Sequence, residues 1–159
     1  MRMNEQLTDA LKRTTADYAE IRVFNDTGLY LAYRGREADR ASAWSSNGGI
    51  VRACHKGGWG IITFDSLDDL PRRVEEACQC AALIGREHTT LALGPPIEAV
   101  HTADFVRDFR GVSVDDKLAL VKSYNDLIMG AGDAIVSSHI VYEELFRTVY
   151  FVASTGTSY

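Results

Sequence analysis

The sequence lacks any long apolar run, and nowhere does it reach the roughly 20 uninterrupted apolar residues that a membrane-spanning helix needs. Residues 1–15 mix acidic and basic side chains and lack the apolar stretch of a secretory signal. The chain also lacks an excess of basic residues, since its formal net charge is -5. Nucleic-acid-binding proteins more often have a basic surface. These absences predict a cytoplasmic protein that contacts neither a membrane nor, directly, nucleic acid.

Cysteine is scarce, with only Cys54, Cys78 and Cys80 among 159 residues. An odd number of cysteines in a chain without a secretory signal argues against a disulfide framework. Free cysteine is among the most buried residue types, so we expect reduced thiols that lie mostly in the core. Apolar residues make up 46% of the chain and charged residues 25%, which is the balance of a folded domain.

Metal-binding motifs are absent too, because the sequence contains no HExxH, no HExxxH and no CxxC pair. The histidines are each isolated in sequence, at His55, His88, His101 and His139. Cys54 and His55 could join Cys78 and Cys80 as zinc ligands. However, adjacent residues on a strand face opposite sides of the sheet. We therefore predict no metal site and no catalytic residue within this chain.

The glycine-rich segment 56–60, Lys-Gly-Gly-Trp-Gly, does not have the spacing of a Walker phosphate loop. It also falls between two predicted strands rather than before a helix, so no helix N-terminus would face a phosphate. We interpret the segment as a tight hairpin. Gly58 and Gly60 would leave room for the Trp59 indole to lie across the sheet.

The spacing of apolar residues predicts both strands and helices. Period-two alternation predicts strands over residues 18–24, 29–33, 37–46, 50–55 and 59–64, with turns at 25–28, 45–49 and 56–58. Helical spacing predicts helices over 4–13, 67–85 and 117–130. Asp65 or Ser66 would cap the second helix, and Gly85 would end it.

These elements predict an α+β fold with a mainly antiparallel sheet of hairpins and a long helix packed on it, followed by a second helix and β-hairpin unit. We divide the chain into an N-terminal α+β domain over residues 1–88, an extended connector over 89–112, and a second region over 113–159. In that region a turn at Glu143-Glu144 would join two strands. Residues 154–159 would form a further turn and the first residues of the next strand, so the region stops in mid-sheet.

Several segments resemble the TldD/PmbA family, whose members are also called modulators of DNA gyrase. Residues 16–23 resemble the family's opening strand. Residues 49–53, followed by Gly57-Gly58-Trp59-Gly60, resemble its "GVGVRV…GGWGF" hairpin, and residues 66–70 resemble the start of its next helix. Residues 114–121 look like the helix that opens the family's second region, and 152–157 like its "N-S-E-G-T" turn, with Thr155 in place of the acidic residue.

The resemblance implies a zinc metallopeptidase that acts as a dimer on unfolded or extended peptides. Family members are considerably longer, and their zinc ligands, an HExxxH helix and a distant cysteine, lie downstream of the segments matched here. The resemblance therefore implies that this chain is a non-catalytic N-terminal portion without a cofactor, and that zinc is bound in the full-length, metal-bearing protein. The portion would help form the cavity wall and a homo- or hetero-dimer with a TldD/PmbA-type subunit.

A sheet edge can hold an extended peptide through backbone hydrogen bonds. We single out two segments as such a peptide or interface surface: the hairpin residues Gly57, Gly58, Trp59 and Gly60, and the strand residues Val149 and Phe151. Packing within the core is the alternative interpretation for both segments. Two other functions stay open at this point, a stand-alone binding or assembly module and a gyrase-associated regulator without peptidase activity.

Overall fold

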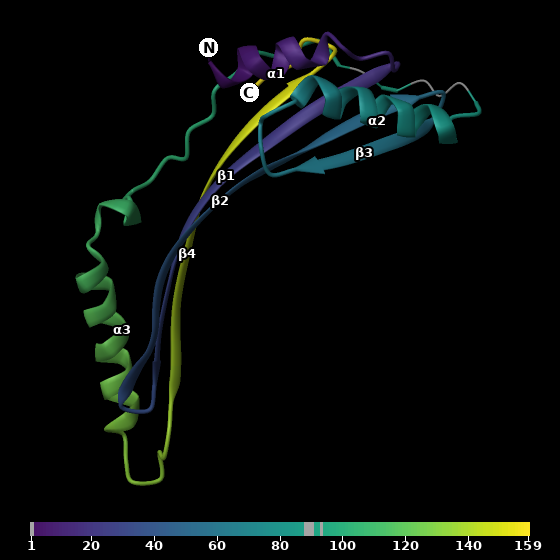
Figure 1. Cartoon of the computed structure of the whole chain (residues 1–159). Helices are drawn as coiled ribbons and strands as arrows, with labels where there is room; N and C mark the ends of the chain where they lie inside the picture. The colour runs from purple at the N-terminus through teal and green to yellow at the C-terminus, as the bar shows by residue number, and fades with distance from the viewer. Residues whose placement is uncertain (1, 88–90, 93) are drawn as a thin grey trace. The chain divides into compact units, whose positions relative to one another are not determined.

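The structure, a computed structural model, describes residues 2–87, 91–92 and 94–159. Along the chain it contains α1 (Met3–Leu11), β1 (Tyr18–Arg34), β2 (Glu37–His55), β3 (Gly58–Phe64), α2 (Leu70–Ile84), the 3-10 helix η1 (Phe109–Gly111), α3 (Val114–Met129) and β4 (His139–Ala153) (Figure 1). The described strands form an antiparallel sheet in the order β3-β2-β1-β4. The predicted α+β class is confirmed.

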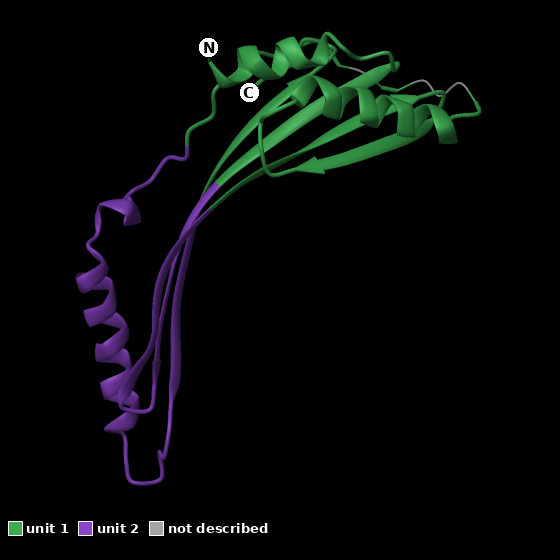
Figure 2. Cartoon of the chain, in the orientation of Figure 1, with its two compact units in different colours: residues 1–25, 46–102, 147–159 green, residues 26–45, 103–146 purple. Residues whose placement is uncertain are grey.

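The chain forms two compact units, and each draws on separate stretches of sequence (Figure 2). Unit 1 contains residues 1–25, 46–102 and 147–159, and unit 2 contains residues 26–45 and 103–146. The strands β1, β2 and β4 therefore contribute residues to both units. The division into domains at residues 88 and 112 stays a prediction, and residues 88–90 and 93 lie outside the described part of the chain.

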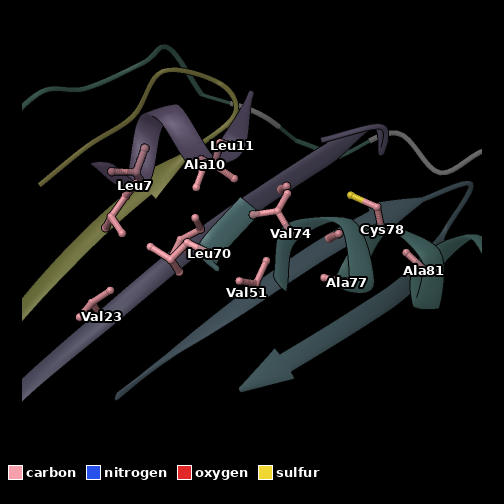
Figure 3. Packing of buried hydrophobic residues seen from close by; sticks show 14 residues of the cluster. Leu7, Ala10, Leu11, Val23, Val51, Leu70, Val74, Ala77, Cys78 and Ala81 are labelled. Atoms are coloured by element: carbon pink, nitrogen blue, oxygen red, sulfur yellow. The ribbon is translucent and has the colours of Figure 1, made fainter. Parts of the chain in front are cut away.

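Unit 1 has its core between the sheet and two helices, α1 and α2, which cover the same face (Figure 3). The strand β1 supplies alternate residues to this core, Ala19, Ile21 and Val23, as period-two spacing requires. The helices supply residues at helical spacing, among them Leu7 and Leu11 of α1 and Leu70, Val74, Ala77 and Ala81 of α2. The predicted helices over residues 4–13 and 67–85 are thus confirmed as amphipathic helices.

Two glycines of β3 allow α2 to lie very close to the sheet. A Cβ atom added at Gly58 would stand 2.3 Å from the Gly85 backbone nitrogen, and one at Gly60 would stand 2.0 Å from the Ala77 carbonyl oxygen. No side chain fits at such distances. The prediction that these glycines make room for the Trp59 indole is therefore wrong, because the space they leave is filled by the backbone of α2.

Of the two caps predicted for α2, the structure confirms the C-terminal one only. Gly85 caps the C-terminus, and its N–H donates to the Ala81 carbonyl oxygen at 2.8 Å. The N-cap is Asp69, in the left-handed conformation with φ of 57°, and its side chain makes no capping hydrogen bond. The predicted caps at Asp65 and Ser66 are therefore wrong.

Three predicted turns are absent, because the chain continues as strand through each of them. Residues 25–28 lie inside β1, residues 45–49 inside β2, and residues 143–144 inside β4. The turn between β1 and β2 lies instead at Gly35, with φ of 58°. The predicted turn at 56–58 is confirmed, since Lys56 and Gly57 both have positive φ between β2 and β3.

Unit 2 packs α3 against the sheet through a separate core. Val121 of α3 lies buried among Leu29, Leu31 and Tyr33 of β1. One helical turn further along, the buried Asn125 donates from Nδ2 to the Gly35 carbonyl oxygen at 2.6 Å. This bond fixes the end of α3 to the β1–β2 turn. Among the described residues no helix is both long and apolar enough to cross a membrane.

Candidate functional site

The candidate site lies on the sheet face of unit 1 opposite to α1 and α2. Because β1 alternates, Glu20 and Arg22 face away from the core that Ala19 and Ile21 enter. On β2, Arg52 faces away in the same manner, since its neighbours Val51 and Ala53 are core residues. Charged side chains from two adjacent strands thus meet on one face.

Glu20 is the centre of this group. Its side chain is only 6% exposed, and its Oε1 accepts a hydrogen bond from Arg52 Nη1 at 3.1 Å and lies 3.4 Å from Arg22 Nη2. Its Oε2 accepts from the Tyr18 hydroxyl at 2.6 Å. Burial, together with this bond to a carboxylate, raises the pKa of Tyr18 above its ordinary value. The buried carboxylate is therefore paired with two guanidinium groups and one phenol.

Each arginine also lies over an aromatic ring. The Arg52 guanidinium carbon is 4.6 Å from the centroid of Trp59 on β3, and that of Arg22 is 5.1 Å from the centroid of Phe151 on β4. Phe151 in turn stacks on Tyr159 with 4.7 Å between ring centroids. We name these residues the arginine–aromatic row, which consists of Tyr18, Glu20, Arg22, Arg52, Trp59, Phe151 and Tyr159.

The residues singled out from sequence do not all reach this face. Trp59 and Phe151 belong to the row, and Val149, two positions before Phe151 on β4, lies on the same face by strand periodicity. Gly57 is exposed in the turn, whereas Gly58 and Gly60 are buried against α2. A binding role for any of them stays a prediction, and the accessible side chains among them are those of Trp59 and Val149.

Sequence reasoning missed the polar centre of the row, Glu20, Arg22 and Arg52. Glu20 and Arg22 look like the solvated side of a half-buried strand. Arg52 lies 32 positions from Glu20, and nothing local predicts that they touch. The available signal was the occurrence of opposite charges at outward positions of two strands that a hairpin could pair.

The outer edge of β4 is covered over a short length by the C-terminal residues. Phe151 and Tyr159 exchange backbone hydrogen bonds of 2.8 and 3.0 Å, and Ala153 N–H donates to the Thr157 carbonyl oxygen at 2.8 Å. The predicted turn followed by the first residues of another strand is thus confirmed. On the side that faces away from β4, Ser158 pairs with residues 97–99, which run parallel to residues 157–159.

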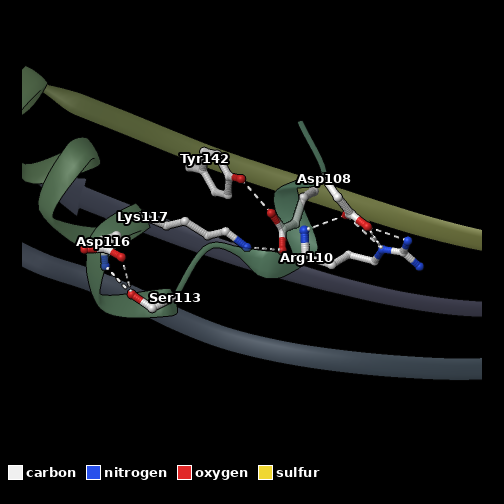
Figure 4. Close-up of polar contacts among 7 residues, drawn as sticks. Asp108, Arg110, Ser113, Asp116, Lys117 and Tyr142 are labelled. Atoms are coloured by element: carbon white, nitrogen blue, oxygen red, sulfur yellow. Dashed lines mark hydrogen bonds and ion pairs between the residues drawn. The ribbon is translucent and has the colours of Figure 1, made fainter. Parts of the chain in front are cut away.

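Unit 2 holds a second polar cluster, built around a buried ion pair (Figure 4). Lys117 Nζ of α3 lies 2.8 Å from Glu144 Oε1 of β4, and the two side chains are 6% and 15% exposed. The Tyr142 hydroxyl donates to the other Glu144 oxygen. Burial and this bond raise the pKa of Tyr142 to about 12. The cluster ties α3 to β4 and leaves each charged group with a partner.

Arg110 of η1 lies beside this cluster and connects the segment before α3 to β4. Its guanidinium pairs with Asp108, with Nη2 2.6 Å from Oδ2, and lies 3.9 Å from the centroid of the Phe146 ring. The hydrogen bonds from Arg110 hold the pKa of Asp108 below its ordinary value. This arrangement anchors the start of α3.

The cysteines and His55 do not converge on a metal. Cys54 faces away from the core that its neighbour Ala53 enters, and His55 follows on the opposite side of β2. Cys78 lies in the core beneath α2, with its sulfur 3.4 Å from the Thr14 hydroxyl. Among the described residues, no three His, Cys, Asp or Glu side chains are grouped as metal ligands. The residues of that described part therefore do not fit a zinc ion.

Sequence comparison identifies the class of protein. A profile of PmbA/TldA metallopeptidase domain 1 matches residues 19–81. A metalloprotease of Synechocystis sp. is 36% identical over 146 residues, which make up 91% of this chain and 32% of that relative. Both matches are to metalloproteases. The chain belongs to the TldD/PmbA family and carries the family's first domain.

Solved structures share the fold at low sequence identity. A proposed modulator of DNA gyrase from Bacteroides thetaiotaomicron superposes with a TM-score of 0.78 and 17% identity, over 97% of this chain and 36% of that one. A second, from Thermotoga maritima, gives 0.76 and 13%, over 98% and 35%. TldE from Thermococcus kodakarensis gives 0.64 and 17%, over 99% and 36%. The chain thus spans about a third of the length of these relatives.

Proposed function

We propose that this chain is a non-catalytic, peptide-binding portion of a TldD/PmbA-type metalloprotease. The observation that carries the proposal is that the arginine–aromatic row lies beside a sheet edge. Trp59 and Val149 offer apolar surface on that face. Phe151 links the row to β4, the outer strand of the sheet.

The outer edge of β4 provides the backbone groups that an extended peptide needs. Phe151 and Ala153 direct their N–H groups outward, to Tyr159 and Thr157. In an antiparallel strand every second residue has the same orientation, so the N–H of Val149 points outward as well. Residues 157–159 pair with β4 at Ala153 and Phe151. An extended peptide would pair with β4 beside Val149, in the manner of β-strand addition.

Catalysis in this proposal belongs to residues outside the chain. The intact protein would bind zinc elsewhere, and the metal would activate water and polarise the peptide carbonyl group. Unit 1 would form part of the wall of the peptide-binding cavity. The relationship to TldE supports pairing with a TldD/PmbA-type subunit as a homo- or hetero-dimer, and we propose a cytoplasmic location for the assembly.

The test is a peptide-binding measurement on a backbone variant and its control. Val149→Pro removes the outward N–H and fits an edge strand, where proline is tolerated. Val149→Ala shortens the side chain but keeps that N–H. We expect Val149→Pro to weaken the binding of fluorescein-labelled unfolded peptides at least tenfold in anisotropy titrations, and Val149→Ala to change it by less than about threefold.

Equal affinities of the two variants and the unaltered chain would overturn the edge-binding part of the proposal. The non-catalytic part is tested separately by zinc analysis and peptidase assays on the purified chain. Stoichiometric zinc together with peptide cleavage by this chain alone would overturn that part.

A further inference from the structure

We propose that Arg22 and Arg52, which Glu20 orients, form a carboxylate-binding site that selects acidic side chains in an extended peptide. The inference rests on the proposed peptide-binding function and adds a specificity to it. Arg22 and Arg52 would be the binding residues. Glu20 would be a positioning residue that acts through them.

The first argument is the number of donors that the arginines still offer. A guanidinium group carries five N–H donors in a planar fork. Within the described residues, the contact of each guanidinium with an acceptor is the one to Glu20 Oε1. The Arg22 Nε atom is buried and has no hydrogen-bond partner there. The side chains of Arg22 and Arg52 are 40% and 36% exposed, so further donors face solvent.

The second argument is that these donors are already held in place. Both guanidinium groups have a nitrogen within 3.4 Å of the same Glu20 oxygen, and each lies over an aromatic ring at the side. Glu20 itself is fixed by the Tyr18 hydroxyl and by burial. A ligand therefore meets donors that have lost much of their conformational freedom before binding. Two fixed forks close to one another match the geometry of a carboxylate.

The third argument is charge. The side chains of the row include two arginines and one carboxylate, so they carry a positive excess on a chain whose net charge is -5. An acidic ligand would be attracted to this face. Phosphates of single-stranded nucleic acid share the negative charge, and bases could stack on Trp59. The overall negative charge of the chain works against that ligand.

The experiment compares matched peptides on the purified chain. One extended peptide alternates Glu with Thr, a second has Gln in place of every Glu, and both are C-terminally amidated so that no terminal carboxylate is present. Calorimetric titration should show that the Glu peptide binds at least tenfold more tightly than the Gln peptide. Arg22→Gln and Arg52→Gln should each reduce this ratio to less than threefold. Arg13→Gln, an equal charge change at an exposed site after α1, should leave it unchanged.

A second measurement uses the unaltered chain, in case an arginine variant does not fold. The indole N–H resonance of Trp59 should shift on addition of the Glu peptide and not of the Gln peptide. Trp44, which lies in unit 2, should not shift with either peptide and serves as the internal control.

The outcomes separate this inference from the proposed function. If the Glu and Gln peptides bind equally well, the carboxylate site is refuted while peptide binding stands. If neither binds, both are refuted. A preference that Arg13→Gln reduces as much as Arg52→Gln also refutes the site. Tighter binding of oligouridylate than of the Glu peptide would assign the row to nucleic acid instead.

Discussion

The buried ion pair between Lys117 and Glu144 makes the sharpest prediction about stability. Replacing Glu144 with Leu leaves the Lys117 ammonium 6% exposed and without its carboxylate. Removing one partner of a buried pair costs about 3–5 kcal/mol. Lys117→Met leaves a carboxylate that Tyr142 still donates to and that is 15% exposed. We expect that variant to lose a smaller amount, about 1–3 kcal/mol.

The double variant distinguishes this reasoning from a simple loss of contacts. With both charges replaced by apolar side chains no buried charge is left unpaired, and such replacements are often close to neutral. We therefore expect the double variant to lie within about 1.5 kcal/mol of the unaltered chain, so that the coupling energy of the mutant cycle reaches several kcal/mol. Urea unfolding monitored by circular dichroism, with unchanged m-values, measures each free energy of unfolding.

The control is an exposed pair on the same helix. Lys122 and Asp126 are four residues apart on α3, and their side chains are 54% and 58% exposed. Lys122→Met should leave the urea midpoint almost unchanged, as is typical of a solvated helical pair. Additive effects of Lys117→Met and Glu144→Leu, with no coupling in the cycle, would refute the account of the cluster.

Three further outcomes follow from individual residues. Gly60→Ala places a Cβ 2.0 Å from the Ala77 carbonyl oxygen and should lower the free energy of unfolding in urea titrations by about 1–3 kcal/mol or more. A Cβ at Gly111 would have no other atom within 4 Å, so Gly111→Ala should not lower the free energy of unfolding. Tyr142 has a pKa raised from 10.0 to about 12, because the folded state favours the neutral form of its phenol. The contribution of this phenol to the free energy of unfolding is complete below pH 10 and is lost as the pH rises through 12. In alkaline unfolding experiments, the stability of Tyr142→Phe should therefore lack this part of the decline with pH. Ser113 caps α3, and Ser113→Ala should cost about 1 kcal/mol in thermal unfolding monitored by circular dichroism.

The helices and the fold class were predictable because their signals are local. Apolar residues at helical spacing mark α1, α2 and α3, and alternation marks β1. The bounds of the strands were not predictable in the same way. Asn-Asp-Thr-Gly at residues 25–28 has the composition of a turn, yet β1 is paired on both sides, by β2 and β4, and continues through it.

The glycines explain why turn composition misled. A Cβ at Gly28 would stand 2.4 Å from the Trp44 ring, and one at Gly49 would stand 2.2 Å from the Phe64 ring. These residues are glycine because an aromatic side chain lies across the strand, and neither has positive φ. Sequence alone does not distinguish a glycine that turns the chain from one that accommodates a ring.

The candidate site was predictable only at its ends. Trp59 and Phe151 stand out as aromatic residues in strands, and both reach the arginine–aromatic row. The centre of the row depends on the strand order, which brings Arg52 of β2 beside Glu20 of β1. Strand order is a property of the whole sheet, and no local pattern encodes it.

The alternation of β1 has an evolutionary consequence. Between Ala19 and Val23, odd positions build the hydrophobic core and even positions supply the arginine–aromatic row. A one-residue insertion or deletion here would exchange the two sets and bury Glu20 and Arg22 beneath the helices. A two-residue change would keep both sets on their own sides. Relatives that retain both the core and the row should therefore differ in this stretch by substitution, or by length changes of even number.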